Sequence, residues 1–117
     1  MQYLLLIYTN EADDLARPEA EQNDIIQRYF SFTQDIVSSG HFKAGDALQP
    51  TDTATTVRVR NGDVMTTDGP FAETKEQLGG YYLIEAADLD EATQIAARIP
   101  SADHGSVEIR PIMVFED

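Results

Sequence analysis

Apolar residues fall on both alternating faces of two short segments, which predicts strands that are covered on both sides. Residues 3–8 read YLLLIY, and residues 80–86 read GYYLIEA. A strand with one solvent-facing side alternates between apolar and polar residues, so this pattern is typical of strands inside a layered fold. We therefore expect both segments to be central strands of one sheet.

Two other segments carry the three- and four-residue spacing of an amphipathic helix. The first runs from Pro18 to about Ser39, just before Gly40, with proline near the start and glycine past the end. Its apolar stripe contains Ile25, Ile26, Tyr29, Phe30, Thr33, Ile36 and Val37. Phe32 lies off this stripe, so we expect its side chain to be exposed or to contact a partner.

The second helix is predicted to follow Asp88 as its N-cap and to end at Pro100. Glu91 lies three residues after Asp88, which is the spacing of a capping box. The apolar face of this helix contains Leu89, Ala92, Ala96 and Ile99. Each predicted helix therefore has one face to bury against a sheet.

A hairpin is predicted between the two helices. Residues 55–60 and 63–66 are strand-like and flank Asn61 and Gly62. An Asn-Gly pair accepts the positive φ angles of a two-residue turn, so the two strands should pair with each other.

The order of these elements predicts one α+β domain over residues 1–117. Extended segments at 41–45 and 107–115 complete a split βαβ arrangement with an extra β-hairpin, and Pro111 places part of the last strand at a sheet edge or a bulge. The sheet would be antiparallel, with both helices on one face. Because its central strands are apolar on both sides, we expect a homodimer in which two sheets close into a shared barrel.

Charge and composition exclude several classes of partner. The chain has 21 Asp and Glu against 8 Lys and Arg, a formal net charge of -13, so we expect no nucleic acid and no anionic membrane as partner. It has no cysteine, which suits the reducing cytoplasm and excludes thiolate chemistry. The apolar N-terminal run is too short to span a membrane and lacks a signal-peptide pattern. A local anion site stays open at Arg58, Arg60, Lys75 and Arg110.

Residues 68–76 (DGPFAETKE) combine turn residues with a high density of charge. One interpretation is structural. Asp68, Gly69 and Pro70 would form a turn, Phe71 would fill a gap in the core, and the charged residues would face water.

The other interpretation of this loop is a ligand site beside a strand of the dimer barrel. Desolvation makes a carboxylate a better base, so Asp68 or Glu73 would act as general base, with Lys75 or a tyrosine as electrophilic partner. Strand alternation directs either Tyr81 or Tyr82 toward the barrel. The expected ligand-binding residues are Asp68, Gly69, Pro70, Phe71, Glu73, Lys75, Glu76 and Tyr81.

Metal and cofactor chemistry find no support in the sequence. The acidic cluster of the loop lacks the regular spacing and the glycine of a calcium loop, so we expect no metal site and no cofactor. Motifs for serine hydrolysis, P-loop phosphoryl transfer, dinucleotide binding and zinc proteases are absent. Of the two histidines, His41 is expected to cap the first helix and His104 to lie in a solvated loop.

Three segments resemble the YCII-related family in its DGPF-domain branch. They are residues 1–8, residues 55–100 and residues 107–112, and their most specific element is DGPFAETKE at 68–76. The resemblance implies a ferredoxin-like fold assembled as a dimeric α+β barrel. It also implies a family whose members often accompany extracytoplasmic-function sigma factors and mostly have no assigned reaction.

Some relatives on the wider YCII side have a histidine in the first helix that is proposed to form a catalytic pair with an aspartate. This sequence has no histidine between Pro18 and Gly40. The resemblance therefore supplies no proton-shuttling imidazole from that helix.

Three functions stay open at this point. We expect a cytoplasmic homodimer that binds a small molecule or acts as an accessory protein, with a cleft at the loop of residues 68–76. The second hypothesis is a cofactor-independent enzyme that uses a loop carboxylate as general base on a small organic substrate. The third, which comes from the resemblance, is a protein partner of a sigma-factor-type regulator.

Overall fold

Four strands form the central sheet of the molecule. The computed structural model describes residues 1–116. The sheet contains β1 (Gln2–Thr9), β2 (Phe42–Ala47), β5 (Gln77–Glu85) and β6 (Ser106–Pro111) in the order β2-β5-β1-β6, with antiparallel pairing throughout. The two segments that are apolar on both faces, β1 and β5, therefore lie at its centre, as predicted.

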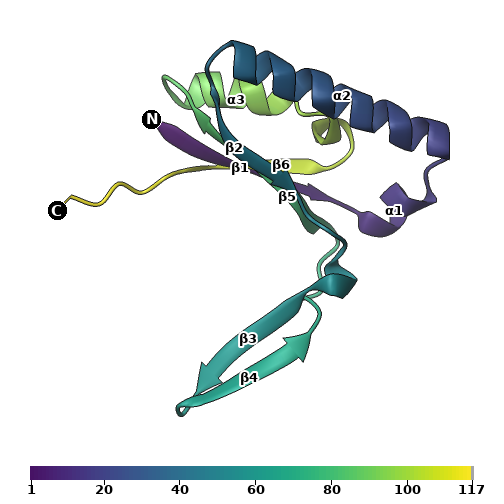
Figure 1. Cartoon of the computed structure of the whole chain (residues 1–117), viewed down its shortest axis with the longest axis vertical. Coiled ribbons are helices and arrows are strands. Elements are labelled where there is room, and N and C mark those ends of the chain that lie inside the picture. The colour runs from purple at the N-terminus through teal and green to yellow at the C-terminus, as the bar shows by residue number, and fades with distance from the viewer. Residues whose placement is uncertain (117) are drawn as a thin grey trace.

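Two helices cover one face of this sheet and bury the core. α2 (Glu19–Ser38) and α3 (Leu89–Ala97) lie on the same side of it (Figure 1). Alternate residues of β1 and β5 are buried, and the largest fully buried side chains are Leu5, Ile36, Ile84 and Ile99. With antiparallel sheets and three helices among the described residues, this mixed α+β architecture is consistent with a ferredoxin-like fold.

The buried face of α2 agrees with the predicted stripe at Ile25, Tyr29, Thr33 and Ile36 and differs from it elsewhere. Phe32, expected to be exposed or at a partner contact, is 5% exposed and packs edge-on against Tyr82, with ring centroids 5.2 Å apart. Ile26, Phe30 and Val37 are 50%, 64% and 54% exposed, although the periodicity placed them on the buried stripe. Apolar residues are distributed around most of this helix, so their spacing alone does not define which side meets the sheet.

α3 begins as predicted and buries a slightly different face. The carboxylate of Asp88 accepts a hydrogen bond of 2.9 Å from the backbone N–H of Glu91, which confirms Asp88 as the N-cap. Leu89 is 55% exposed, and Ile95 is buried with the predicted residues Ala92, Ala96 and Ile99.

A short helix before Pro18 is absent from the sequence prediction. α1 (Glu11–Ala16) follows Asn10, whose side-chain oxygen accepts a hydrogen bond of 3.0 Å from the backbone N–H of Asp13. Acidic residues in its first turn add stability because they face the positive end of the helix dipole. Six residues are too few to show an amphipathic repeat, so periodicity does not detect this helix.

The final strand is shorter than predicted. β6 ends at Pro111, and residues 112–116 have no regular secondary structure. Proline lacks the N–H that would continue the ladder. Met113, Val114 and Phe115 in this tail are 73%, 84% and 81% exposed.

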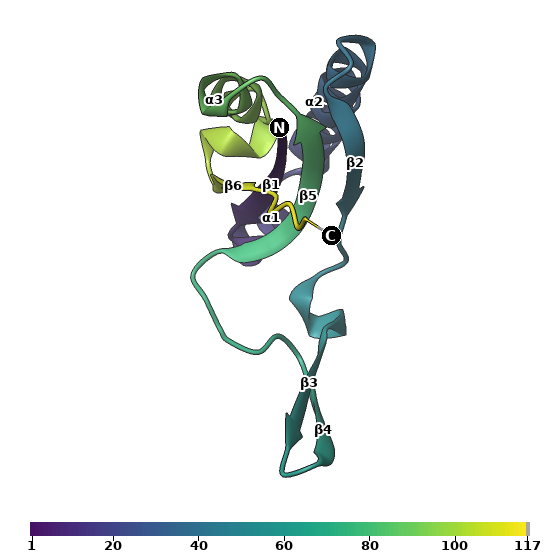
Figure 2. The same cartoon turned by 90° about the vertical axis from the view of Figure 1, so that its left-hand side faces the viewer.

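The predicted hairpin extends away from the sheet as an arm, which comprises β3 (Thr55–Arg60), β4 (Asp63–Asp68) and the turn between them (Figures 1 and 2). Its turn is as predicted, with φ of 52° at Asn61 and 81° at Gly62. Because of the arm, the radius of gyration is 16.3 Å, against about 13 Å for a compact chain of this length.

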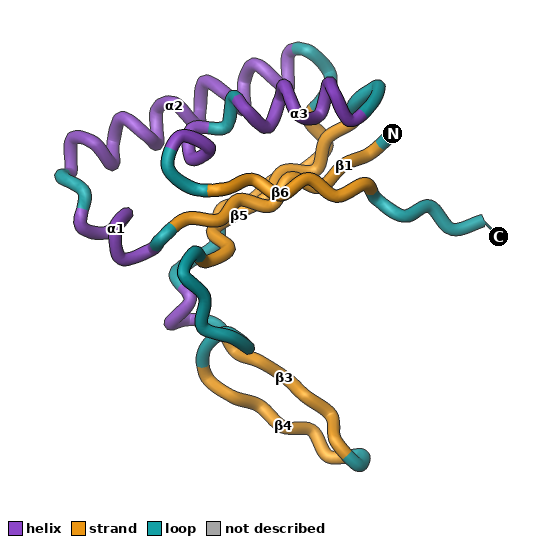
Figure 3. Tube along the Cα trace, turned by 180° about the vertical axis from the view of Figure 1, so that it is seen from behind, coloured by secondary structure: helices purple, strands orange, loops and turns teal. Residues whose placement is uncertain are grey.

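The side of the sheet away from the helices, called the open face here, is apolar at its centre. Figure 3 shows both long helices on the other side of the sheet. Leu4, Leu6 and Leu83 point to the open face by strand alternation and are only partly buried. Polar residues flank them, with Tyr81 and Asp46 on one side and Glu108 and Arg110 on the other.

Candidate functional site

A cavity of about 490 Å³ lies between the helices and the edge of the sheet. Its walls come from the end of β1, from α1, from α2 between Gln22 and Thr33, from strands β2 and β5, from the link after β2, and from the 3-10 helix η2 (Pro100–Asp103) with the turn that follows it. Because β2 is the edge strand, the cavity lies where the packed core meets solvent. Small-molecule sites typically have volumes of roughly 300 to 1,000 Å³, so this cavity has the size of a ligand site.

Most of the cavity wall is apolar. Its apolar lining residues are Ile7, Leu15, Ile25, Ile26, Tyr29, Phe42, Ala47, Leu48, Pro50 and Tyr82. Gly45 allows part of this wall to form, because a Cβ atom there would lie 2.7 Å from Cδ1 of Tyr82. The wall therefore favours a ligand with substantial apolar surface.

Two pairs of hydroxyl groups border the cavity on the α2 side. Tyr29 donates a hydrogen bond of 2.5 Å to Oγ of Ser101, and the hydroxyls of Thr33 and Tyr82 share one of 2.7 Å. Tyr29 and Thr33 are four residues apart on one helix, so the two pairs are neighbours along the same face. They give the apolar cavity a row of polar atoms.

Burial sets the protonation of the two tyrosines. It raises the pKa of Tyr29 and of Tyr82, while the hydrogen bonds to Ser101 and Thr33 lower them by a smaller amount. Both phenols are therefore protonated at neutral pH and act as neutral hydrogen-bonding groups.

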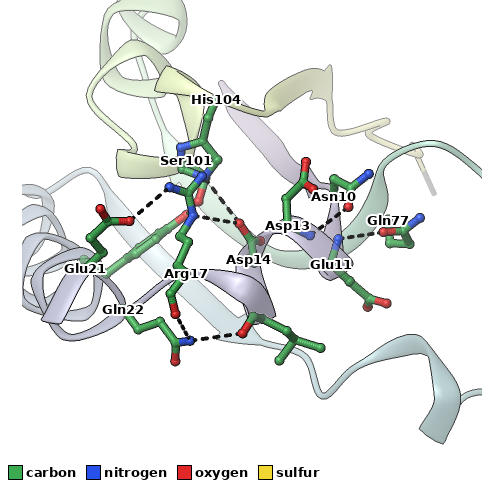
Figure 4. A network of polar contacts seen from close by, with 12 residues as sticks. Asn10, Glu11, Asp13, Asp14, Arg17, Glu21, Gln22, Gln77, Ser101 and His104 are labelled. Atoms are coloured by element: carbon green, nitrogen blue, oxygen red, sulfur yellow. Dashed lines mark hydrogen bonds and ion pairs between the residues drawn. The ribbon is translucent and has the colours of Figure 1, made fainter. Parts of the chain in front are cut away.

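An aspartate, an arginine and a histidine meet where α1 approaches η2 (Figure 4). Nε of Arg17 donates to Oδ1 of Asp14 at 3.4 Å, and Nε2 of His104 lies 3.7 Å from the same oxygen. All three residues border the cavity. His104 lies in an exposed turn after η2, as expected, and its side chain, which is 27% exposed, also borders the cavity.

His41 lies near the end of α2, as expected, and takes a second partner. Its Nδ1 is 2.6 Å from Oγ of Ser39, and its Nε2 is 3.1 Å from a carboxylate oxygen of Glu91 on α3. It therefore connects the ends of α2 and α3. His41 is not one of the residues that line the cavity in the described part of the chain.

The loop of residues 68–76 lies outside this cavity in the single chain. Of the predicted ligand-binding residues, Tyr81 borders the cavity. Asp68, Pro70, Phe71, Glu73 and Lys75 are exposed, and Gly69 and Glu76 are partly buried. Phe71 is 79% exposed, so it does not fill the core of its own chain as the structural interpretation expected. A role of these residues in binding stays a prediction.

Strand alternation determines which tyrosine of β5 faces the helices. Tyr82 is 8% exposed and packs under α2. Tyr81 lies on the open face, where its hydroxyl donates to Oδ2 of Asp46 at 2.8 Å. This hydrogen bond to a carboxylate raises the pKa of Tyr81.

The family of the chain follows from its whole length. Residues 1–116 match the YCII-related domain. The chain belongs to the YCII-related family. An uncharacterized protein of Rhizobium meliloti (strain 1021) is 36% identical over 118 residues, which cover 99% of this chain and 95% of that protein.

A solved structure with a similar fold comes from an enzyme. The 5-chloro-2-hydroxyhydroquinone dehydrochlorinase of Burkholderia phenoliruptrix AC1100, in complex with 2,5-dihydroxybenzoquinone, aligns with a TM-score of 0.52. The alignment covers 97% of this YCII-related chain and 94% of the enzyme. Sequence identity is 14%, so the likeness concerns the fold.

In this YCII-related chain, Asn10 and Glu11 at the start of α1 bind the segments that lead into and out of the arm, and we call these two residues the clasp. The carboxylate of Glu11 accepts hydrogen bonds from N–H and Oγ1 of Thr51, at 2.9 and 2.7 Å, where the chain enters the arm. Where it returns, Asn10 donates to the carbonyl of Lys75 at 3.2 Å and the N–H of Glu11 to Gln77 at 2.9 Å. Glu11 also borders the cavity, so α1 connects the cavity with the root of the arm.

Among residues 1–116 of this YCII-related chain, no group of three or more His, Cys, Asp or Glu side chains is placed to hold a metal ion. None of the helices described there is long and apolar enough to cross a bilayer.

Alkaline pH should destabilise the YCII-related chain through Tyr29 and Tyr82. Their pKa values are raised in the folded state, so the unfolded chain loses these protons first as the pH passes 10.0. The free energy of unfolding should therefore be unaffected by them below that pH and fall above it. Urea unfolding from about pH 8 to pH 11 should show a smaller fall for Tyr29→Phe combined with Tyr82→Phe than for the wild type. Equal slopes would contradict the assignment.

Proposed function

We propose that this YCII-related chain, as a member of the DGPF branch, is a homodimeric protein that binds a small organic molecule in the cavity between α2 and β2. The single observation that carries the proposal is the cavity itself, which combines a volume of about 490 Å³ with an apolar wall and a small set of polar atoms. Ligand sites are commonly built in this way, because burial supplies affinity and a few polar groups fix orientation.

The polar atoms of the cavity favour a ring that carries oxygen substituents. Tyr29 and Thr33, which carry the two hydroxyl pairs, lie one helical turn apart on α2. A ring with oxygen substituents on two sides could form hydrogen bonds with both pairs. The 2,5-dihydroxybenzoquinone bound by the dehydrochlorinase of similar fold is a ring of this kind, which supports this ligand class and an enzymatic alternative.

A second copy of the chain is the proposed partner. Val57, Val59 and Val64 lie on one face of the arm and are 60%, 57% and 71% exposed. A two-stranded hairpin is marginally stable by itself, so this valine face needs a surface to pack on. The open face offers Leu4 and Leu6 within a polar rim, which is the composition of an interface core. The arm and the open face of a partner subunit could cover each other.

The loop of residues 68–76 is a second proposed place for the ligand. Its exposed carboxylates at Asp68 and Glu73 and the amine of Lys75 would be desolvated if a second subunit covered them, and either carboxylate could then act as a base. A regulator protein as a further partner stays a proposal from the family resemblance, and co-purification of a sigma factor would support it.

Ligand binding should be seen with hydroquinone as probe and its saturated counterpart 1,4-cyclohexanediol as comparison. The ring should raise the melting temperature of the wild type more than the saturated diol does, because a flat ring matches the aromatic wall better. Ile26→Trp adds bulk at the cavity rim and should weaken hydroquinone binding at least about tenfold by calorimetry, whereas Val37→Trp on the same helix should bind normally.

Two loop variants decide between the cavity and the loop. Asp68→Asn and Glu73→Gln should leave the hydroquinone-induced shift unchanged if the cavity is the site. If both abolish the shift without altering the melting temperature of the free protein, the loop is the site and the cavity is not. Normal binding by Ile26→Trp, or no response of the wild type to hydroquinone, would refute the cavity as the site.

A further inference from the structure

We propose that His104 accepts a proton from a weakly acidic hydroxyl group of the bound molecule, which the cavity then holds as an oxyanion. This inference rests on the proposed function, because it requires a ligand in the cavity. It adds the chemical class of that ligand, which is a phenol or an enol. The argument starts from the three side chains that meet at the cavity wall, Asp14, Arg17 and His104 (Figure 4).

One ring nitrogen of His104 faces a carboxylate. Nε2 lies 3.7 Å from Oδ1 of Asp14, which is longer than a hydrogen bond but short enough for strong electrostatic attraction. The carboxylate favours a hydrogen on Nε2, so in the neutral ring Nδ1 carries a lone pair. Nδ1 is therefore the atom that accepts a proton.

The backbone that carries His104 is held in place by hydrogen bonds and by close packing on β1. The N–H groups of His104 and Gly105 both donate to the carbonyl of Ser101, at 3.3 and 2.7 Å. A Cβ atom at Gly105 would lie 2.2 Å from the carbonyl oxygen of Tyr8, so this turn is packed directly on β1. The turn therefore places His104 at the cavity border on a backbone that cannot easily shift, and Asp14 is the contact that orients its ring.

An imidazolium at His104 and an oxyanion in the cavity would each lie near a group of opposite charge. Asp14 on α1 stabilises the protonated ring, and Arg17 beside it supplies positive charge for the ionised ligand. Among the other titratable groups nearby, Glu21 lies 3.9 Å from Arg17, and Asp103 pairs with Arg28 at 3.0 Å. Tyr29 is a neutral donor to Ser101. Glu11 and Asp13 are the remaining acidic residues of α1.

The step conserves atoms and electrons. The O–H bond of the ligand breaks, its proton forms an N–H bond at Nδ1, and the electron pair stays on the ligand oxygen. Nothing is oxidised or reduced. Asp14 is a positioning residue, because it acts on the ring of His104 and stabilises the charge that develops there.

4-Nitrophenol tests this step, because its ionised form absorbs visible light and its neutral form does not. Its methyl ether, 4-nitroanisole, has nearly the same shape and no proton to give. At a pH where the free dye is mostly neutral, dye bound to the wild type should have an ionised-to-neutral ratio at least about tenfold above that of the free dye, equivalent to one pH unit.

His104→Gln should lose this increase while it still binds 4-nitroanisole, and Asp14→Asn should lose part of it. His41→Gln is the matched control. The ring of His41 bonds to Ser39 and Glu91 away from the cavity wall, so this variant should ionise the dye as the wild type does.

The two readouts separate failure of the inference from failure of the proposed function. If calorimetry detects binding of neither 4-nitrophenol nor 4-nitroanisole, the ligand site itself is refuted, and the inference is refuted as well. If 4-nitroanisole binds but bound 4-nitrophenol stays neutral, the ligand site stands and the inference is refuted. Ionisation by His104→Gln equal to that of the wild type would refute it as well.

Discussion

A chain that carries Val59→Asp and Val64→Asp is expected to run as a monomer at micromolar concentration, where the wild type should run as a dimer. The two valines face each other across the hairpin on the exposed side of the arm. A carboxylate at each position would have to be desolvated within the proposed interface, which typically costs several kcal/mol. The dimer dissociation constant, measured by light scattering over a concentration series, should rise at least about a hundredfold.

Met65→Asp combined with Thr67→Asp is the matched control, because it adds the same charge on the opposite face of the arm. This variant should keep the mass of the dimer. A monomeric wild type would refute the homodimer. A double-valine variant that stays dimeric would show that the arm is not the interface.

Ile36→Ala is expected to produce the largest loss of stability of any substitution named here. Ile36 is 0% exposed and lies in the core between α2 and the sheet. Removing most of its side chain should lower the free energy of unfolding by about 3 kcal/mol, because buried apolar surface is lost and a cavity is left in the core. For a domain of this size the melting temperature should fall by about 10 °C.

Val37→Ala provides the comparison on the same helix. Val37 is 54% exposed, so its truncation should change the free energy of unfolding by less than about 0.5 kcal/mol. Equal losses from the two variants in urea unfolding would mean that the helix packs with a different side toward the sheet.

The strands and the hairpin could be predicted from the sequence because their signals are local. β1 and β5 carry apolar residues on both faces, and Asn61 with Gly62 specifies a two-residue turn without help from the rest of the fold. The capping interaction of Asp88 is local in the same sense. These elements give the correct order and the correct layer arrangement.

The orientation of α2 could be predicted only in part, because it depends on contacts with distant strands. Ile36 lies on the predicted side and is buried, whereas Ile26 and Phe30 are as apolar as Phe32 and are exposed, since Phe32 packs on Tyr82. Short α1 was missed for a related reason. Its stability comes from the cap at Asn10 and from contacts with Lys75 and Gln77, which follow the arm in the sequence.

The cavity could not be predicted from the sequence. Asp14 and His104 are separated by most of the chain, and they meet because β6 pairs with β1 and brings the turn after η2 beside α1. The loop of residues 68–76 has an unusual composition that indicates a candidate site, whereas the cavity wall consists mostly of apolar residues that carry no such signal. One available signal was the spacing of Tyr29 and Thr33, which places two hydroxyl groups on one helix face.

The clasp connects the cavity with the root of the arm through α1. Glu11 forms hydrogen bonds with the segments that lead into and out of the arm. Asp14 and Leu15 lie about one turn further along the same helix and form part of the cavity wall. A ligand that displaced this helix would therefore also act on the contacts at the root of the arm. If two subunits pair through their arms, occupancy of one cavity would then affect the interface with the neighbouring subunit.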